Sequence, residues 1–106
     1  MAKICFLGAG STIFARSVLG DCLHVDSLSD AHISLVDIDP SRLHVSDVML
    51  RNINRTLGTQ ATVEAFLAKD APRALAGADY VVNAIQVGGY EPSTVIDFEV
   101  PKRYGL

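Results

Sequence analysis

Short apolar runs separated by helical patterns organise most of the chain. Residues 3–7, 33–37 and 62–66 are rich in apolar and β-branched side chains, and residues 79–85 form a fourth run of the same kind. Continuous runs of this length are typical of strands that are covered on both faces, as in a parallel sheet. The pattern therefore predicts four β-strands.

The segment between the first two runs shows the periodicity of an amphipathic helix. Phe14, Val18, Cys22 and Val25 recur at spacings of four, four and three residues. This spacing places the four side chains on one stripe of a helix, and we expect that stripe to be its apolar side.

The second helix has clear signals at both ends. Asp39 is suited to cap the free N–H groups at its start, Pro40 suits the first helical position, and Gly58 is a natural stop. Its buried side is expected to consist of Leu43, Leu50, Ile53 and Leu57. Residues 70–76 predict a short third helix, and residues 91–100 predict a fourth.

Strands that alternate with helices indicate βαβ units, in which the strands run parallel. We therefore predict an α/β fold with a Rossmann-type sheet of four parallel strands in the order 3-2-1-4 and helices on both faces. The two further strands of a complete six-stranded sheet do not follow within the 106 residues. We interpret residues 1–106 as one truncated domain of a larger protein. Its open apolar edge beside the fourth strand is expected to promote self-association.

Composition narrows the possible functions. Apolar residues make up 49% of the chain, enough for a core, and the net charge of −3 disfavours nucleic acid or an anionic membrane surface as a partner. No apolar run approaches the roughly 18 to 20 residues of a membrane helix, and the first residues do not resemble a signal peptide. Cys5, Cys22 and the three histidines lack metal-ligand spacing. We interpret both cysteines as buried free thiols in a reducing cytoplasm.

Gly8 and Gly10 stand between the first strand and the first helix, where dinucleotide-binding proteins hold a pyrophosphate. Backbone N–H groups at a helix start can bind phosphate oxygens, and the helix dipole favours their charge. A side chain at Gly8 would obstruct the turn, and one at Gly10 would block the phosphates. Ser11 and Thr12 can add hydroxyl donors or cap the helix. Ile13 replaces the usual third glycine, which predicts a helix further from the sheet, and an ordinary strand-to-helix turn is the alternative.

Asp37 supports the dinucleotide interpretation. It ends the second strand, 27 residues after Gly10, where a carboxylate can accept hydrogen bonds from the adenosine ribose hydroxyls. A carboxylate there also repels a 2′-phosphate, which favours NAD over NADP. The alternative is that Asp37 is only a polar strand end or a helix cap, although Asp39 already fills the cap.

The end of the fourth strand is the second candidate region. Ligands of open α/β sheets bind outside the carboxyl ends of the strands, where the strand order reverses. Residues 83–87 and the glycine pair that follows them would lie there and face the nicotinamide ribose. Asn83 could equally be an interior amide whose hydrogen bonds are satisfied.

Four segments resemble family 4 glycoside hydrolases, particularly their α-galactosidase and α-glucosidase branch. They are KICFLGAGSTIFAR at residues 3–16, LVDID at 35–39, RNINRTLG at 51–58 and NAIQVGGYEPSTVIDFEVPKRYGL at 83–106. The resemblance covers nearly the whole chain. Its last segment is the most specific, because ordinary dehydrogenases do not carry VGGYEPS after the fourth strand.

The resemblance implies an NAD- and Mn²⁺-dependent glycosidase that acts on α-galactosides or related α-glycosides and forms homo-oligomers. In such enzymes NAD⁺ takes a hydride from C3 of the sugar, a base removes the C2 proton, the glycosidic group is eliminated, and the hydride returns. The metal polarises the C2 and C3 oxygens as a Lewis acid.

The resemblance also implies roles for individual residues. Gly8, Gly10, Ser11 and Thr12 match the pyrophosphate loop, Asp37 matches the ribose carboxylate, and Gln86, Val87 and Gly88 match the loop beside the nicotinamide and the sugar. The metal ligands and the catalytic tyrosine of the family lie beyond the last residue, so we expect no catalytic or metal-binding residue in this chain. Two alternatives stay open: a relative of lactate or malate dehydrogenases, which LVDID also fits, and a non-catalytic NAD-binding module.

Overall fold

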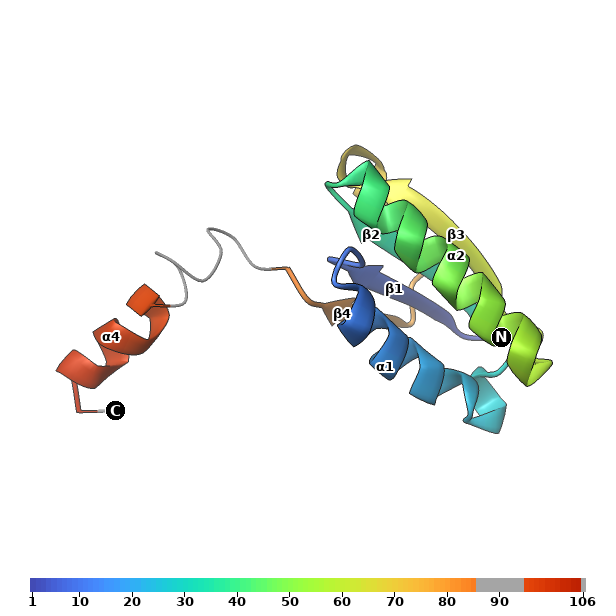
Figure 1. Cartoon of the computed structure of the whole chain (residues 1–106), viewed down its shortest axis with the longest axis horizontal. Coiled ribbons are helices and arrows are strands. Elements are labelled where there is room, and N and C mark those ends of the chain that lie inside the picture. The colour runs from blue at the N-terminus through green and yellow to red at the C-terminus, as the bar shows by residue number, and fades with distance from the viewer. Residues whose placement is uncertain (86–94, 106) are drawn as a thin grey trace.

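The computed structural model describes residues 1–85 and 95–105 (Figure 1). In chain order its strands and helices are β1 (Lys3–Leu7), α1 (Thr12–Leu23), β2 (His32–Asp37), α2 (Pro40–Leu57), β3 (Thr62–Leu67), α3 (Ala71–Leu75), β4 (Tyr80–Asn83) and α4 (Val95–Arg103). Short 3₁₀ helices precede β2 and α3, at Asp26–Leu28 and Ala68–Asp70. The four predicted strands and the four predicted helices are present, with shifts of a few residues at their ends.

The strands form one parallel sheet in the order β3-β2-β1-β4, which confirms the predicted topology. β1 lies inside the sheet and pairs with β2 on one side and with β4 on the other. Because all the strands run parallel, they end at the same edge of the sheet. The segments that follow β1, β2 and β4 therefore meet at that edge.

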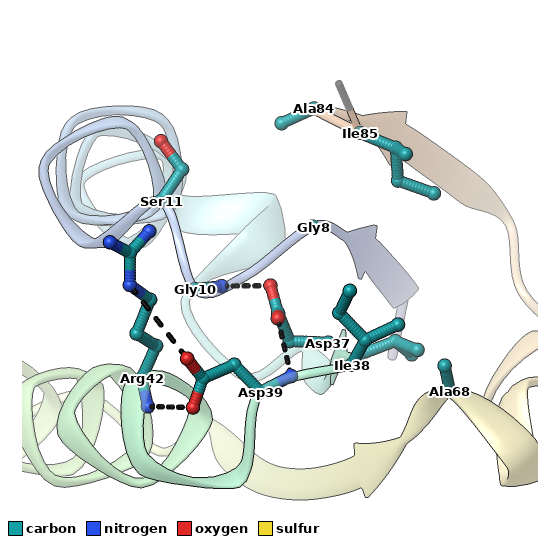
Figure 2. Close-up of a pocket in the computed structure, with 11 residues that line it drawn as sticks. Gly8, Gly10, Ser11, Asp37, Ile38, Asp39, Arg42, Ala68, Ala84 and Ile85 are labelled. Carbon is teal, nitrogen blue, oxygen red and sulfur yellow. Dashed lines mark hydrogen bonds and ion pairs between the residues drawn. The ribbon is translucent and has the colours of Figure 1, made fainter. Parts of the chain in front are cut away.

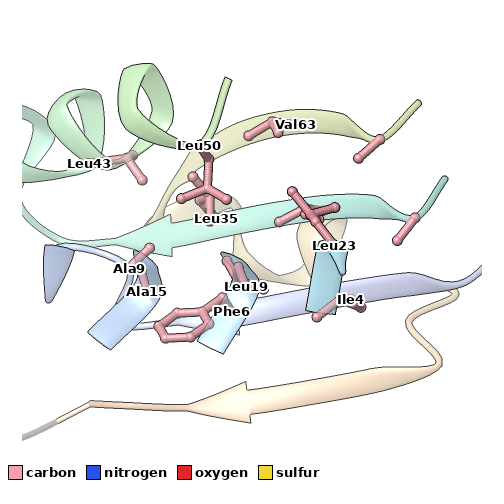
Figure 3. Packing of buried hydrophobic residues seen from close by; sticks show 13 residues of the cluster. Ile4, Phe6, Ala9, Ala15, Leu19, Leu23, Leu35, Leu43, Leu50 and Val63 are labelled. Atoms are coloured by element: carbon pink, nitrogen blue, oxygen red, sulfur yellow. The ribbon is translucent and has the colours of Figure 1, made fainter. Parts of the chain in front are cut away.

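The main hydrophobic core lies between one face of the sheet and the two longer helices packed on it, α1 and α2 (Figure 3). Successive side chains of a strand point to opposite faces, so alternate residues of each strand enter this core. The strands contribute Ile4, Phe6, Ile33, Leu35 and Val63, and the helices contribute Ala15, Leu19, Leu23, Leu43 and Leu50. This packing sets the position of both helices above the sheet.

The opposite face of the sheet carries a smaller cluster around the short helix α3. Its buried members are Cys5, Val36 and Ala74. Ser34 is also fully buried, and within the part of the chain that the structure describes its hydroxyl has no hydrogen-bond partner. Helices thus cover both faces, as predicted, but the cover on this side is limited. Val81, in register with Cys5, remains 51% exposed.

The stripe predicted for α1 is wrong by about one position. Ala15, Leu19 and Leu23 are the buried residues of this helix, whereas Phe14 is 45% exposed and Val25 lies beyond the end of the helix. The other two members of the predicted stripe are partly buried against the core. Alanine is a weak hydrophobic signal in a sequence pattern. The prediction therefore followed the larger Phe14 next to Ala15, and the predicted stripe is off by one position.

The position of the usual third glycine lies in the first turn of α1. Ile13 occupies that position and is 75% exposed. Its side chain therefore does not lie between α1 and the sheet. The wider separation predicted for this helix stays a prediction.

α2 begins and ends where the sequence predicts. The side chain of Asp39 caps the helix by accepting hydrogen bonds from two N–H groups of the first turn, and Pro40 is the first helical residue. Gly58 ends the helix with a left-handed φ of 68°. Leu57 was expected to be buried but is 37% exposed. An 18-residue helix is about 27 Å long and a six-residue strand about 20 Å, so the last turn extends past the sheet.

β4 is shorter than predicted and forms one edge of the described sheet. It runs from Tyr80 to Asn83 and does not continue to Ile85. Asp79, predicted as the first strand residue, precedes the strand and bonds to Lys3 at the start of β1. Its side chain accepts the Lys3 N–H at 2.8 Å, and its own N–H donates to the Lys3 carbonyl at 2.8 Å. Self-association through this edge stays a prediction.

α4 extends past the end predicted for the fourth helix. It continues through Pro101 to Arg103, while residues 91–94 of the predicted helix lie outside the described residues. Among the helices that the structure describes, none combines the length and the apolar character needed to cross a membrane.

The assigned core can be tested on α2. We expect Leu50→Ala to lower the free energy of unfolding by about 2–5 kcal/mol, because it leaves a cavity at a fully buried position. Leu57→Ala removes the same atoms from a partly exposed side chain of the same helix and should cost much less. Urea unfolding followed by circular dichroism measures both values. Equal losses for the two variants would contradict this core.

Candidate functional site

A cavity of about 530 Å³ opens at the carboxyl ends of β1, β2 and β4 (Figure 2). The strand order reverses between β1 and β4, so this is where ligands bind in open α/β sheets. The cavity is lined by Gly8, Gly10, Ser11, Val36, Asp37, Ile38, Asp39, Arg42, Ala68, Ala84 and Ile85. Four of the predicted cofactor-binding residues are among them: Gly8, Gly10, Ser11 and Asp37.

Gly8 fits the turn after β1 against the end of β4. Its φ of 87° lies in the left-handed region. An ideal Cβ at this position would lie 2.8 Å from the carbonyl carbon and oxygen of Ala84. The N–H groups of Gly8 and Ala9 both donate to the Val36 carbonyl, at 2.8 and 2.9 Å. The turn is therefore held between the ends of β2 and β4, and this position excludes a side chain.

The Asp37 carboxylate holds Gly10 in place. Its Oδ2 accepts the Gly10 N–H at 2.6 Å, and its Oδ1 accepts the Asp39 N–H at 2.9 Å. An ideal Cβ at Gly10 would lie 2.5 Å from this Oδ2. The sequence predicts that phosphates exclude a side chain at Gly10, and in the structure the Asp37 carboxylate by itself excludes one. Each carboxylate oxygen can accept a second hydrogen bond, so capacity for a ligand hydroxyl remains.

α1 begins at the cavity wall with unused backbone donors. Ser11 directly precedes the helix, and its side chain makes no capping hydrogen bond. Its carbonyl accepts the Ala15 N–H at 2.9 Å. No hydrogen bond within the described part of the chain uses the N–H groups of residues 12–14. Free N–H groups at the positive end of a helix dipole suit an anionic ligand.

Thr12 belongs to a network around the buried Ser46. The Thr12 hydroxyl oxygen lies 3.2 Å from Ser46 Oγ and 3.4 Å from the Gly10 carbonyl oxygen. Ser46 Oγ donates to the Ala9 carbonyl at 2.5 Å and so joins α2 to the glycine turn. Thr12 is thus engaged within the protein and does not line the cavity. Ser46 was missed, because one serine in a helical pattern gives no signal of such a distant contact.

Asp39 and Arg42 bring further charge to the cavity. Oδ2 of Asp39 lies 3.9 Å from Nε of Arg42, and the two side chains are 47% and 72% exposed. An exposed ion pair at this separation contributes little to stability. With Asp37, two carboxylates and one guanidinium line this part of the cavity. The sequence predicts Asp39 only as the cap of α2 and gives no signal that Arg42 lies at the cavity.

Asn83 ends β4 without lining the cavity. It is exposed, so it is not the interior amide considered as an alternative, and its Oδ1 accepts the Ile85 N–H at 3.0 Å. The two residues that follow it, Ala84 and Ile85, do line the cavity. Its predicted contact with the nicotinamide ribose stays a prediction. Gln86, Val87 and Gly88 lie outside the described residues.

Both cysteines are free thiols packed in apolar surroundings. Removal from water raises the pKa of the Cys5 thiol and of the Cys22 thiol, so both stay protonated at neutral pH. Within residues 1–85 and 95–105, no group of three or more histidine, cysteine, aspartate or glutamate side chains could hold a metal ion. The free N–H groups at the start of α1 and the Asp37 carboxylate are groups that suit an anionic ligand with hydroxyls.

The network beneath the turn generates a prediction about stability. We expect Ser46→Ala to lower the free energy of unfolding by about 1–3 kcal/mol, because the buried Ala9 carbonyl loses its donor. Ser41→Ala changes an exposed serine of the same helix and serves as the control. Chemical denaturation of both variants gives the comparison. If Ser46→Ala costs no more than the control, the hydrogen bond to the turn has no stabilising role.

The chain can now be compared with known proteins. The sequence model of the family described as "Family 4 glycosyl hydrolase" matches residues 3–106. The α-galactosidase of Bacillus subtilis (strain 168) is 55% identical over 106 residues, which is all of this chain and 24% of that protein. The α-galactosidase of Rhizobium meliloti (strain 1021) is 32% identical over 104 residues, and the α-glucosidase of Erwinia rhapontici is 32% identical over 115 residues. These two alignments cover 98% of this chain and 21% and 22% of the relatives.

The chain thus spans about a quarter of the length of these relatives or slightly less. The family match covers the glycine turn, the acid at the end of β2 and every described element of the sheet. A match of this extent, together with three curated relatives at or above 32% identity, is decisive for the family. The chain belongs to family 4 of the glycosyl hydrolases.

Proposed function

We propose that this chain is the NAD-binding domain of an NAD- and metal-dependent glycosidase that cleaves α-galactosides or related α-glycosides. The observation that carries the proposal is one cavity that combines the glycine turn, the start of α1 and the Asp37 carboxylate, in a chain of family 4. Residues 1–106 would act within a longer cytoplasmic protein that forms homo-oligomers.

The cavity residues fit the pyrophosphate of a dinucleotide. The unused N–H groups of residues 12–14 offer donors at the positive end of α1, where phosphate charge is favoured. Gly8 and Gly10 line the cavity and place no side chain in it. The exposed Ser11 has a hydroxyl that makes no capping bond and can donate to a phosphate oxygen.

The position of Asp37 supports recognition of the adenosine ribose. Its bonds to the Gly10 and Asp39 N–H groups hold the carboxylate in one direction. A group that is already oriented loses little conformational freedom when a ligand binds, which favours affinity. The remaining lone pairs can accept the 2′- and 3′-hydroxyls, and the negative charge disfavours a 2′-phosphate. NAD is therefore the proposed cofactor.

The other end of the cavity would hold the nicotinamide half. Figure 2 places Ala84 and Ile85 across the cavity from Asp39 and Arg42. We therefore assign the β4 side to the nicotinamide ribose, with Asn83, Gln86, Val87 and Gly88 as the proposed contacts. Bound NAD would supply a reversible hydride acceptor for C3 of the sugar. The residues of this chain would bind and orient the cofactor rather than react with the sugar.

The sugar and the metal are proposed on the resemblance and on the relatives. Two α-galactosidases and one α-glucosidase among the relatives support an α-glycoside as the substrate. The resemblance implies Mn²⁺, but the described residues offer no group of ligands for it, so the proposal assigns it no residue here.

Membership in family 4 disfavours the lactate or malate dehydrogenase alternative. A non-catalytic NAD-binding module remains the second candidate, because every described feature of the cavity serves binding.

Binding of the cofactor can be measured on this chain. At about 100 times its dissociation constant, NAD⁺ should stabilise the fold by roughly 2.7 kcal/mol and raise the melting temperature by about 10 °C. Asp37→Ala should abolish the shift, because it removes both the ribose acceptor and the support of Gly10. Asp47→Ala removes an α2 carboxylate that does not line the cavity and should keep the shift. A wild-type chain without any shift, or a full shift in Asp37→Ala, would refute the cofactor site.

The glycosidase part of the proposal needs a longer protein that contains this chain. Such a protein should hydrolyse a chromogenic α-galactoside only when NAD⁺ is present, without net accumulation of NADH, because the hydride returns to the sugar. Accumulation of NADH with lactate or malate would instead support the dehydrogenase alternative. Binding of NAD⁺ without either activity would support the non-catalytic module.

A further inference from the structure

We propose that Asp39 is a second determinant of cofactor selectivity, acting through Arg42. The Asp39 carboxylate lies 3.9 Å from Arg42 Nε and offsets the charge of this guanidinium, so the net charge beside the adenosine ribose stays negative and disfavours a 2′-phosphate. The inference rests on the proposed function, since it concerns the adenosine end of the proposed NAD cavity.

Asp37 is not the only charged residue at this end of the cavity. Its two oxygens already accept the N–H groups of Gly10 and Asp39, so the carboxylate cannot turn away without breaking both bonds. Asp39 and Arg42 line the same cavity. A 2′-phosphate on the adenosine ribose would therefore lie near two carboxylates and one guanidinium.

The helix cap determines where the Asp39 carboxylate lies. Its Oδ1 accepts the N–H groups of Ser41 at 2.9 Å and of Arg42 at 3.3 Å. Its Oδ2 is then the oxygen nearest the guanidinium, 3.9 Å from Arg42 Nε. The same side chain thus serves the helix and neutralises the cation beside the cavity.

Arg42 is placed to reach a phosphate bound in the cavity. An ideal Cβ at Gly10 would lie 3.1 Å from the Arg42 Cβ, so the stem of this side chain runs along the glycine turn. Figure 2 shows its guanidinium extending toward Ser11 at the start of α1. The side chain is 72% exposed and free to change rotamer. Dinucleotide-binding folds that prefer NADP use an arginine near this place to hold the 2′-phosphate.

The sign of the effect follows from the charges. A 2′-phosphate is strongly anionic and enters a region where carboxylates outnumber cations, so it is disfavoured. Neutralising Asp39 leaves one carboxylate against one guanidinium, so the Arg42 donors can bind the phosphate oxygens without a second carboxylate beside them. Because asparagine caps helices about as well as aspartate, Asp39→Asn should change the charge and leave α2 intact.

The test compares dissociation constants of NAD⁺ and NADP⁺, measured by calorimetry at low ionic strength. Asp39→Asn should raise the affinity for NADP⁺ relative to NAD⁺ by roughly tenfold, the gain expected from one new charge-assisted bond to phosphate. Adding Arg42→Gln to this variant should remove the gain. Asp47→Asn breaks another aspartate–arginine pair of α2, with Arg51, outside the cavity and should leave the ratio unchanged. Asp39→Ser provides a second capping variant in case the asparagine chain folds poorly.

Two results would overturn the inference while leaving NAD binding intact. The first is an unchanged ratio in both capping variants, and the second is a gain that persists after Arg42→Gln. If the wild-type chain binds neither nucleotide, the proposed function itself fails and the inference fails with it. A gain that depends on Arg42 and weakens at high salt supports it, since screening reduces the interaction of exposed charges.

Discussion

The contact between the Asp37 carboxylate and the Gly10 N–H is the interaction on which the candidate site depends. It connects the end of β2 to the turn after β1, and its second oxygen extends the connection to Asp39 at the start of α2. The carboxylate can come this close only because residue 10 has no side chain. One acid and one glycine, 27 positions apart in the sequence, therefore determine the shape of the cavity together.

The rest of the fold holds this contact in position. Parallel pairing of β1 with β2 and β4 brings their carboxyl ends to one edge. The Val36 carbonyl receives two N–H groups of the turn, and Ser46 bonds to the Ala9 carbonyl from α2. α2 is itself placed by Leu43 and Leu50 in the core. The turn is thus supported by a strand and a helix that are both fixed by burial.

The sheet order followed from the alternation of strands and helices, which is typical of Rossmann-type folds. Local signals were sufficient for the cap at Asp39 and the stop at Gly58, because each depends on neighbouring residues. They failed where distant segments meet. The hydrogen bond of Ser46 and the closeness of Arg42 to Gly10 arise only when α2 packs above the turn. The buried side of α1 was misplaced for a related reason, because fit against the sheet outweighed side-chain size. The proposed chemistry on the sugar rests on the family resemblance and on no described residue.

The wall of the cavity at the start of α1 is made largely of main chain. Besides the Ser11 hydroxyl its donors are backbone amides, and its shape depends on the two glycines after β1. Alanine scanning would therefore leave these amides in place at every position and would underestimate their importance. Replacing single amides by esters in the first turn of α1 would delete a donor without altering any side chain. Amide-to-ester substitution is therefore the change that would test the contribution of these N–H groups to ligand binding.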